Sequence, residues 1–81
     1  MEVEVLLFAA LADICGRTTL RTRLAADTTA AALLAQLAQE HPMLAASLRH
    51  TRVAADARFL APSERVLPGR ELALIPPVSG G

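Results

Sequence analysis

Residues 71–81 read ELALIPPVSGG, an alternating segment followed by two prolines and two terminal glycines. Its first five residues alternate between two faces, with Leu72 and Leu74 on one face and Ile75 on the other. Such alternation predicts a half-buried strand. The strand runs directly into Pro76-Pro77, which fix φ near −65° and favour an extended chain. We therefore expect a last strand that ends at Ile75, followed by an extended segment.

The same stretch closes on Gly80-Gly81. Neither residue has a Cβ, so this segment can adopt φ angles that other residues avoid and can enter a narrow cleft. We expect the carboxylate of Gly81 to be an accessible chemical group. A frayed terminus is the alternative interpretation.

The beginning of the chain predicts two more strands. Val3, Val5 and Leu7 alternate with Glu2, Glu4 and Leu6, which indicates a first strand. The apolar run 5–8 indicates burial on both faces there, or one face kept for a partner. Residues 19–24 alternate cleanly and predict a second strand, paired with the first as a hairpin.

Helix formers concentrate in two segments. Residues 9–15 predict one or two helical turns that stop at Gly16. Residues 30–39 predict the principal helix, which ends before Pro42. Its expected N-cap candidates are Asp27, Thr28 and Thr29. Its apolar stripe is Leu33, Leu34 and Leu37, with Gln36, Gln39 and Glu40 expected to lie mostly away from it.

The second half is less regular. Residues 52–55 and 58–60 are short extended fragments around an expected turn at 56–57, and Pro68-Gly69 is a further turn signal. The order of strand, strand, helix and two or three strands predicts an α+β roll of the β-grasp type. We expect a mixed sheet of four to five strands packed on one main helix, with the first and last strands parallel at its centre. The expected organisation is one domain, 1–75, with a flexible tail, 76–81.

Composition limits the classes of function. The chain has 81 residues, 53% of them hydrophobic and 20% charged, which fits one globular domain. Eight arginines balance eight acids, and Phe8 and Phe59 are the only aromatic residues. Neither feature resembles a nucleic-acid-binding surface, so we expect no nucleic-acid partner.

The remaining chemical groups are few. Cys15 is the only cysteine and lies in an alanine-rich stretch, so we expect its side chain to be inert and buried. A single cysteine cannot form an intramolecular disulfide, which fits a reducing compartment. His41 and His50 have no partner at metal-ligand spacing, and we expect no metal. The acidic start and the lack of an apolar run of about 18 residues favour a cytoplasmic protein without a membrane partner. Arg49 and Arg52, near Arg58, could line the contact with an acidic partner surface, but scattered arginines are usually solvated, and we expect these to be so.

Four motifs together resemble a known family. They are VLLFA at 5–9, Thr28-Thr29, LPGREL at 67–72 and PPVSGG at 76–81. The chain resembles the small, sulfur-carrier subunit of molybdopterin synthase, a ubiquitin-like β-grasp protein. The terminal hexapeptide is the specific part of the resemblance, which covers the whole length.

The resemblance implies a mechanism. Gly81 would be adenylated by an E1-like enzyme that uses ATP, and then converted to a thiocarboxylate. The tail, including Gly80, would enter the large catalytic subunit, where its sulfur passes to a pyranopterin precursor. The chain itself would be a non-catalytic, sulfur-donating subunit that binds no cofactor.

A tail alone gives little affinity, so a second surface is expected. The resemblance places an apolar docking patch at Phe8, Phe59 and Ile75. The tail residues Pro76, Pro77, Val78 and Ser79 would also contact partners. For Phe59 an ordinary core position is an equally good interpretation.

Three alternatives stay open from the sequence. The carrier could serve thiamine, cysteine or another sulfur pathway. The chain could be a ubiquitin-like modifier joined to lysines of other proteins. It could also be a plain β-grasp interaction module whose glycines are incidental.

Overall fold

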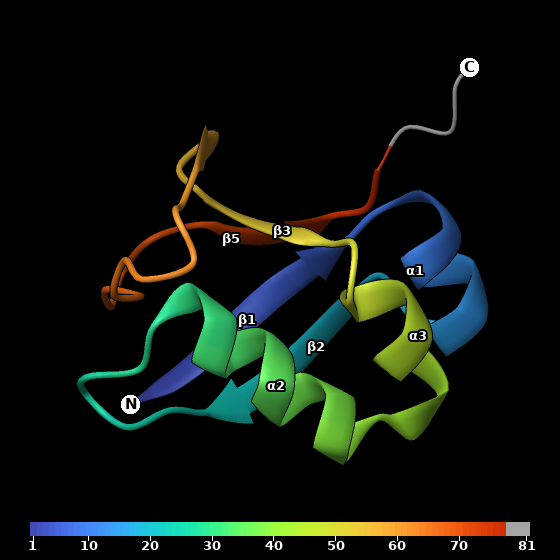
Figure 1. Cartoon of the computed structure of the whole chain (residues 1–81), viewed down its shortest axis with the longest axis horizontal. Helices are drawn as coiled ribbons and strands as arrows, with labels where there is room; N and C mark the ends of the chain where they lie inside the picture. The colour runs from blue at the N-terminus through green and yellow to red at the C-terminus, as the bar shows by residue number, and fades with distance from the viewer. Residues whose placement is uncertain (78–81) are drawn as a thin grey trace.

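The computed structural model of the protein describes residues 1–77 and shows helices packed on one side of a five-stranded sheet (Figure 1). This arrangement confirms the predicted α+β β-grasp roll. In chain order the elements are β1 (Glu2–Leu7), α1 (Ala9–Cys15), β2 (Thr19–Arg23), α2 (Ala30–Glu40), the 3₁₀ turn η1 (Pro42–Leu44), α3 (Ala45–Leu48), β3 (Arg52–Ala55), β4 (Arg58–Phe59) and β5 (Leu72–Ile75).

The sheet is mixed, and its strand order is β2-β1-β5-β3-β4. β1 pairs in parallel with β5, with Val5 opposite Leu72 and Leu7 opposite Leu74. The other pairs are antiparallel. The last strand is therefore central, as the sequence predicted, and is held on both sides by hydrogen-bonded neighbours.

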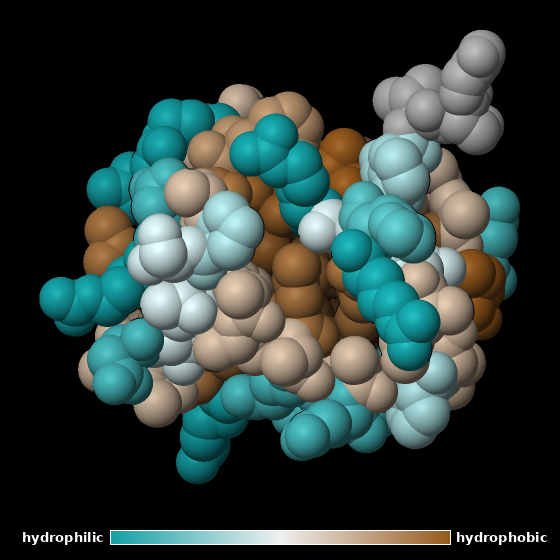
Figure 2. All heavy atoms as spheres, in the orientation of Figure 1, coloured by the Kyte–Doolittle hydropathy of each residue, from teal (hydrophilic) through white to brown (hydrophobic). Residues whose placement is uncertain are grey.

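The core lies between the sheet and α2. Inward residues alternate along each long strand, and α2 adds Leu33 and Leu37, both fully buried. Leu34, expected in the same stripe, is only half-buried. It lines a shallow hollow of about 260 Å³ beside α3. Figure 2 shows the helix-covered face of the molecule, with hydrophobic residues (brown) at the floor of the central hollow.

The polar side of α2 differs from the prediction. Gln36 and Glu40 reach back to the sheet and contact Thr22, an inward residue of β2 that is 6% exposed. The Thr22 hydroxyl donates to Glu40 Oε1 at 2.8 Å and accepts from Gln36 Nε2 at 2.7 Å. Gln36 also donates to the carbonyl of Arg23 at 2.8 Å. These bonds satisfy a buried hydroxyl that would otherwise be costly.

The start of α2 is fixed by a cap and by the long loop before β5. Among the predicted candidates, Thr29 is the N-cap, and its hydroxyl accepts from the Ala32 amide at 3.2 Å. The amide of Ala30 donates to the Glu64 carbonyl, and the amide of Val66 donates to the Thr28 carbonyl. The loop therefore closes one end of the core, where Val66 is fully buried.

Candidate functional site

The exit of the tail is set by β5. This central strand ends at Ile75 and continues into Pro76, which is half-buried, and Pro77, which is exposed. Both prolines line a shallow cleft of about 330 Å³ together with Ala10, Leu11, Ala46, Ser47 and His50. The chain thus leaves the sheet from a central strand, at the end of the molecule where α1 and α3 lie (Figure 1).

The predicted tail residues Val78, Ser79, Gly80 and Gly81 lie outside the described residues. The expected role of Gly81, with Gly80, in carrying and donating sulfur stays a prediction, and so do the expected partner contacts of Val78 and Ser79. Sequence reasoning gave no role to His50, whose place in the tail-exit cleft follows only from the packing of α3 near β5.

The sheet face opposite α2 carries an apolar patch. We call it the open-face patch and define it by strand register as Leu6, Phe8, Ala54, Phe59, Ala73 and Ile75. Leu6 pairs with Ala73, Ala73 with Ala54, and Ala54 with Phe59, which forms one row across four strands. Paired residues point to the same face.

The three predicted docking residues therefore share one face. Ile75 follows Ala73 by two positions on β5, and Phe8 follows Leu6 by two positions in extended backbone. Phe8 is 46% exposed and Phe59 is 48% exposed, so neither is an ordinary core residue. Large aromatic side chains left in water on a common face are typical of an interaction surface.

The turn after β1 holds Phe8 in position. Phe8 is the N-cap residue of α1, with φ −121° and ψ 155°. The next residue, Ala9, has a φ of 51°, which is unusual for a residue with a Cβ. α1 then ends at Gly16, whose φ is 73°. Phe8 is consequently the last outward side chain before the chain leaves the sheet.

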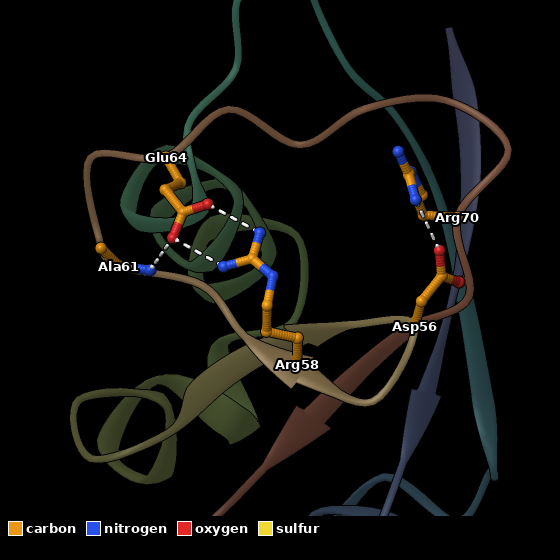
Figure 3. A network of polar contacts seen from close by, with 5 residues as sticks. All are labelled: Asp56, Arg58, Ala61, Glu64 and Arg70. Carbon is orange, nitrogen blue, oxygen red and sulfur yellow. Dashed lines mark hydrogen bonds and ion pairs between the residues drawn. The ribbon is translucent and has the colours of Figure 1, made fainter.

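The β3–β4 hairpin, which presents Phe59, is fastened on both sides (Figure 3). At its turn, Asp56 accepts from the Glu71 amide and from Arg70, both at 2.9 Å. On the other side, Arg58 donates to both carboxylate oxygens of Glu64, the shorter contact being 2.9 Å. These contacts tie the hairpin to the loop that leads into β5.

The same contacts shift the acid–base equilibria of the hairpin. The Glu71 amide, with the Arg70 guanidinium, holds the pKa of Asp56 below its usual range. The Arg58 guanidinium, with the Ala61 amide, lowers the pKa of Glu64, and Glu64 in turn raises the pKa of Arg58. Both carboxylates are therefore ionised at neutral pH and hold the hairpin electrostatically.

Other reactive groups do not assemble into a site within the described part of the chain. Residues 1–77 contain no group of three or more His, Cys, Asp or Glu side chains placed to hold a metal ion. Cys15, expected to be buried, is half-buried at the end of α1 because the helix is only seven residues long and packs through Leu11. Within this same range no helix is long and apolar enough to cross a membrane.

Relatives agree with this architecture over the full chain. A curated protein from Haloferax volcanii, small archaeal modifier protein 1, is 36% identical over 98% of this chain and 100% of its own length. A crystal structure of that protein superposes with a TM-score of 0.81 at 35% identity and covers all of both chains. A complex of subunits 1 and 2 of the molybdopterin-converting factor from Helicobacter pylori contains a chain of the same fold, with a TM-score of 0.68, 23% identity and full coverage of both chains.

The family comparison reaches further along the sequence than the described structure does. The ThiS family model matches residues 5–81, from the middle of β1 through the two glycines. This match agrees with the β-grasp topology and with the full-length relative. The chain belongs to the ThiS family.

Proposed function

We propose that this protein carries sulfur on the carboxylate of Gly81 and donates it during molybdopterin synthesis. The observation that carries the proposal is the position of the tail exit: Pro76-Pro77 continue a central strand beside a face with two exposed phenylalanines. A rigid exit next to a docking surface lets a partner bind the domain and thread the tail in one orientation. The PPVSGG ending supports molybdopterin synthesis over other sulfur pathways.

The chemistry divides into activation and transfer. A terminal carboxylate has a pKa of about 3.3–3.7 and is ionised at neutral pH, so it is nucleophilic but a poor electrophile. Its oxygen attacks the α-phosphorus of ATP on an E1-like enzyme, and pyrophosphate leaves. A sulfur nucleophile then displaces AMP, which leaves a thiocarboxylate.

Transfer requires a second partner. The large catalytic subunit of molybdopterin synthase would receive the tail and pass the sulfur to the pyranopterin precursor. Hydrolysis then restores the carboxylate of Gly81. Gly80 and Gly81 lack side chains, so both partners can reach the acyl carbon within a narrow pocket. The chain contributes the acyl group and the docking surface, and its partners contribute the catalytic groups.

A mass measurement tests the proposal directly. Trypsin cleaves after Arg70 and releases residues 71–81, a peptide that contains neither Met1 nor Met43. A gain of about 16 mass units on this peptide, from protein purified out of its own cells, therefore reports sulfur for oxygen and not methionine oxidation. Deleting Gly81 should abolish the gain. An unmodified peptide from cells that are actively making molybdenum cofactor would contradict the proposal.

Conjugation to proteins is a second candidate function, favoured by the 36% identical relative that is named a modifier. All basic residues of this chain are arginines, so acceptor lysines would be on other proteins. Trypsin would leave the remnant ELALIPPVSGG on each acceptor lysine. Finding that remnant would support the modifier function, and finding only the free thiocarboxylate would support the carrier function.

A further inference from the structure

Arg52 lies at the border of the open-face patch and, unlike the apolar residues that define the patch, carries a charge. It is the register partner of Ile75 on β5 and is exposed. Its guanidinium carbon lies 4.5 Å from the centre of the Phe59 ring. The sequence suggested a scattered, solvated arginine, whereas the structure places this cation directly on a predicted docking residue.

The neighbouring charges do not neutralise Arg52. The ion pairs among residues 1–77 are Arg21–Glu4, Arg58–Glu64 and Arg70–Asp56. On the open face, Glu4 is thus already engaged by Arg21 on the neighbouring strand. Arg52 takes part in none of these pairs. The N–H groups of its guanidinium make no hydrogen bond to the described part of the chain.

Stacking restricts Arg52 without using its hydrogen-bonding capacity. A guanidinium over an aromatic face is attracted by the ring quadrupole and loses rotamer freedom before any partner arrives. Its five N–H donors lie at the edge of the planar group and stay available for a carboxylate. The side chain is therefore already oriented for a bidentate contact.

Covering the patch would remove water from Arg52. A charge buried without a partner is strongly unfavourable, whereas an arginine–carboxylate pair with good geometry offsets the loss of hydration. A purely apolar partner surface is consequently penalised at this position, and an acidic one is accepted. Arg52 thus converts a general apolar patch into a selective one.

We infer that the adenylating enzyme that activates this chain presents an Asp or Glu carboxylate to Arg52 when it covers the open-face patch. The inference rests on the proposed function, in that activation by an adenylating enzyme is assumed. It does not depend on the sulfur pathway, because sulfur carriage and protein conjugation both begin with adenylation of the tail.

The experiment uses the intact protein and the adenylating enzyme of the same cells, identified as the one whose deletion abolishes the mass gain on residues 71–81. Isothermal titration calorimetry compares the wild type with Arg52→Gln and Arg52→Glu. We expect binding to weaken about tenfold or more for Arg52→Gln and further for Arg52→Glu, because a buried carboxylate is left unpaired or repelled. Arg52→Lys keeps the charge but not the planar fork and should fall between the wild type and Arg52→Gln.

Matched controls separate this effect from a general change of charge. Arg49→Gln removes an exposed arginine at the end of α3, outside the strands that carry the open-face patch, and should bind within about twofold of the wild type. Circular dichroism at 222 nm checks that each variant is folded. Changing one acidic residue of the enzyme to lysine should restore binding of Arg52→Glu and weaken binding of the wild type.

The outcomes distinguish the inference from the proposed function. If Arg52→Gln and Arg52→Glu bind and are loaded like the wild type while Phe59→Ala is impaired, the acidic contact is wrong and the docking face stands. If all three variants bind normally, the enzyme docks elsewhere and the inference is also overturned. Absence of any modification on wild-type 71–81 overturns the proposed function, and the inference with it.

Discussion

The two faces of the sheet carry similar apolar side chains but differ in what covers them. Toward α2, Leu72 and Leu74 of β5 are almost completely buried. On the opposite face of the same strand, Ala73 and Ile75 are half-buried, and the nearby Phe8 and Phe59 are about half exposed. The apolar content of a strand therefore does not tell which face stabilises the domain and which face is left for a partner.

This difference reflects the supply of covering elements. A chain of 81 residues provides one long helix, α2, which can cover only one face of a five-stranded sheet. A domain of this size has little stability to spare, so an exposed apolar face needs a compensating use. The open-face patch and the tail exit lie at the same end of β5, which links that use to the tail.

Two adjacent residues on β5 should show the largest difference between the two faces of the sheet. Leu74→Ala removes a side chain that is fully buried beneath α2 and should lower the free energy of unfolding by about 3–4 kcal/mol. Ile75→Ala, one residue later on the other face, should lower it by only about 1 kcal/mol, because less area is buried. Urea unfolding followed by circular dichroism measures both, since the chain has no Trp or Tyr.

Binding should reverse the order of the two variants. At temperatures where both are folded, Ile75→Ala should lose affinity for the adenylating enzyme, and Leu74→Ala should keep it. Equal destabilisation by the two substitutions would mean that the open face is as important for folding as the core face. Equal affinity would remove Ile75 from the docking surface.

Much of this architecture is predictable from sequence because its long elements are periodic. The alternation of β1, β2 and β5 and the 3.6-residue stripe of α2 identify each element, and Pro42 and Gly16 identify two of the helix ends. The apolar docking residues were named from family resemblance, and the register then placed them on one face.

The polar contacts were not predictable, for a physical reason. The bond of Thr22 to Glu40 and Gln36 joins β2 to α2, and no periodic pattern within either element specifies a partner. The stacking of Arg52 on Phe59 depends on the register of β3 with β4. β4 has only two residues, too few for any alternation to be detected.

The turn of the β3–β4 hairpin provides a smaller test of how the open face is built. Asp56 and Ala57 have φ angles of 49° and 67°, a region that costs a non-glycine residue about 1–2 kcal/mol. Ala57→Gly should therefore raise the free energy of unfolding by about 0.5–1 kcal/mol, after the greater flexibility of the unfolded chain is subtracted. Ala55→Gly, in the ordinary extended backbone of β3, is the matched control and should be destabilising. Destabilisation by Ala57→Gly would show that the turn is not strained.

Lowering the pH should loosen the β3–β4 hairpin, and this is the smallest of the three effects expected here. Because the folded-state pKa of Asp56 is lowered, its contribution is complete above the unfolded pKa of about 3.9 and is lost as the pH falls through the folded value. As the pH is lowered from 6 to 2.5, the amide resonances of Glu71 and Phe59 should shift before that of Leu74. The hydrogen bond between the Glu71 amide and Asp56 holds the hairpin and not the core. In Asp56→Asn the part of the Glu71 amide shift that comes from its bond to Asp56 should disappear, because position 56 no longer carries a carboxylate. A simultaneous change of all three resonances in the wild type would mean that the hairpin and the helix-covered core unfold as one unit, and that the two faces differ in exposure but not in local stability.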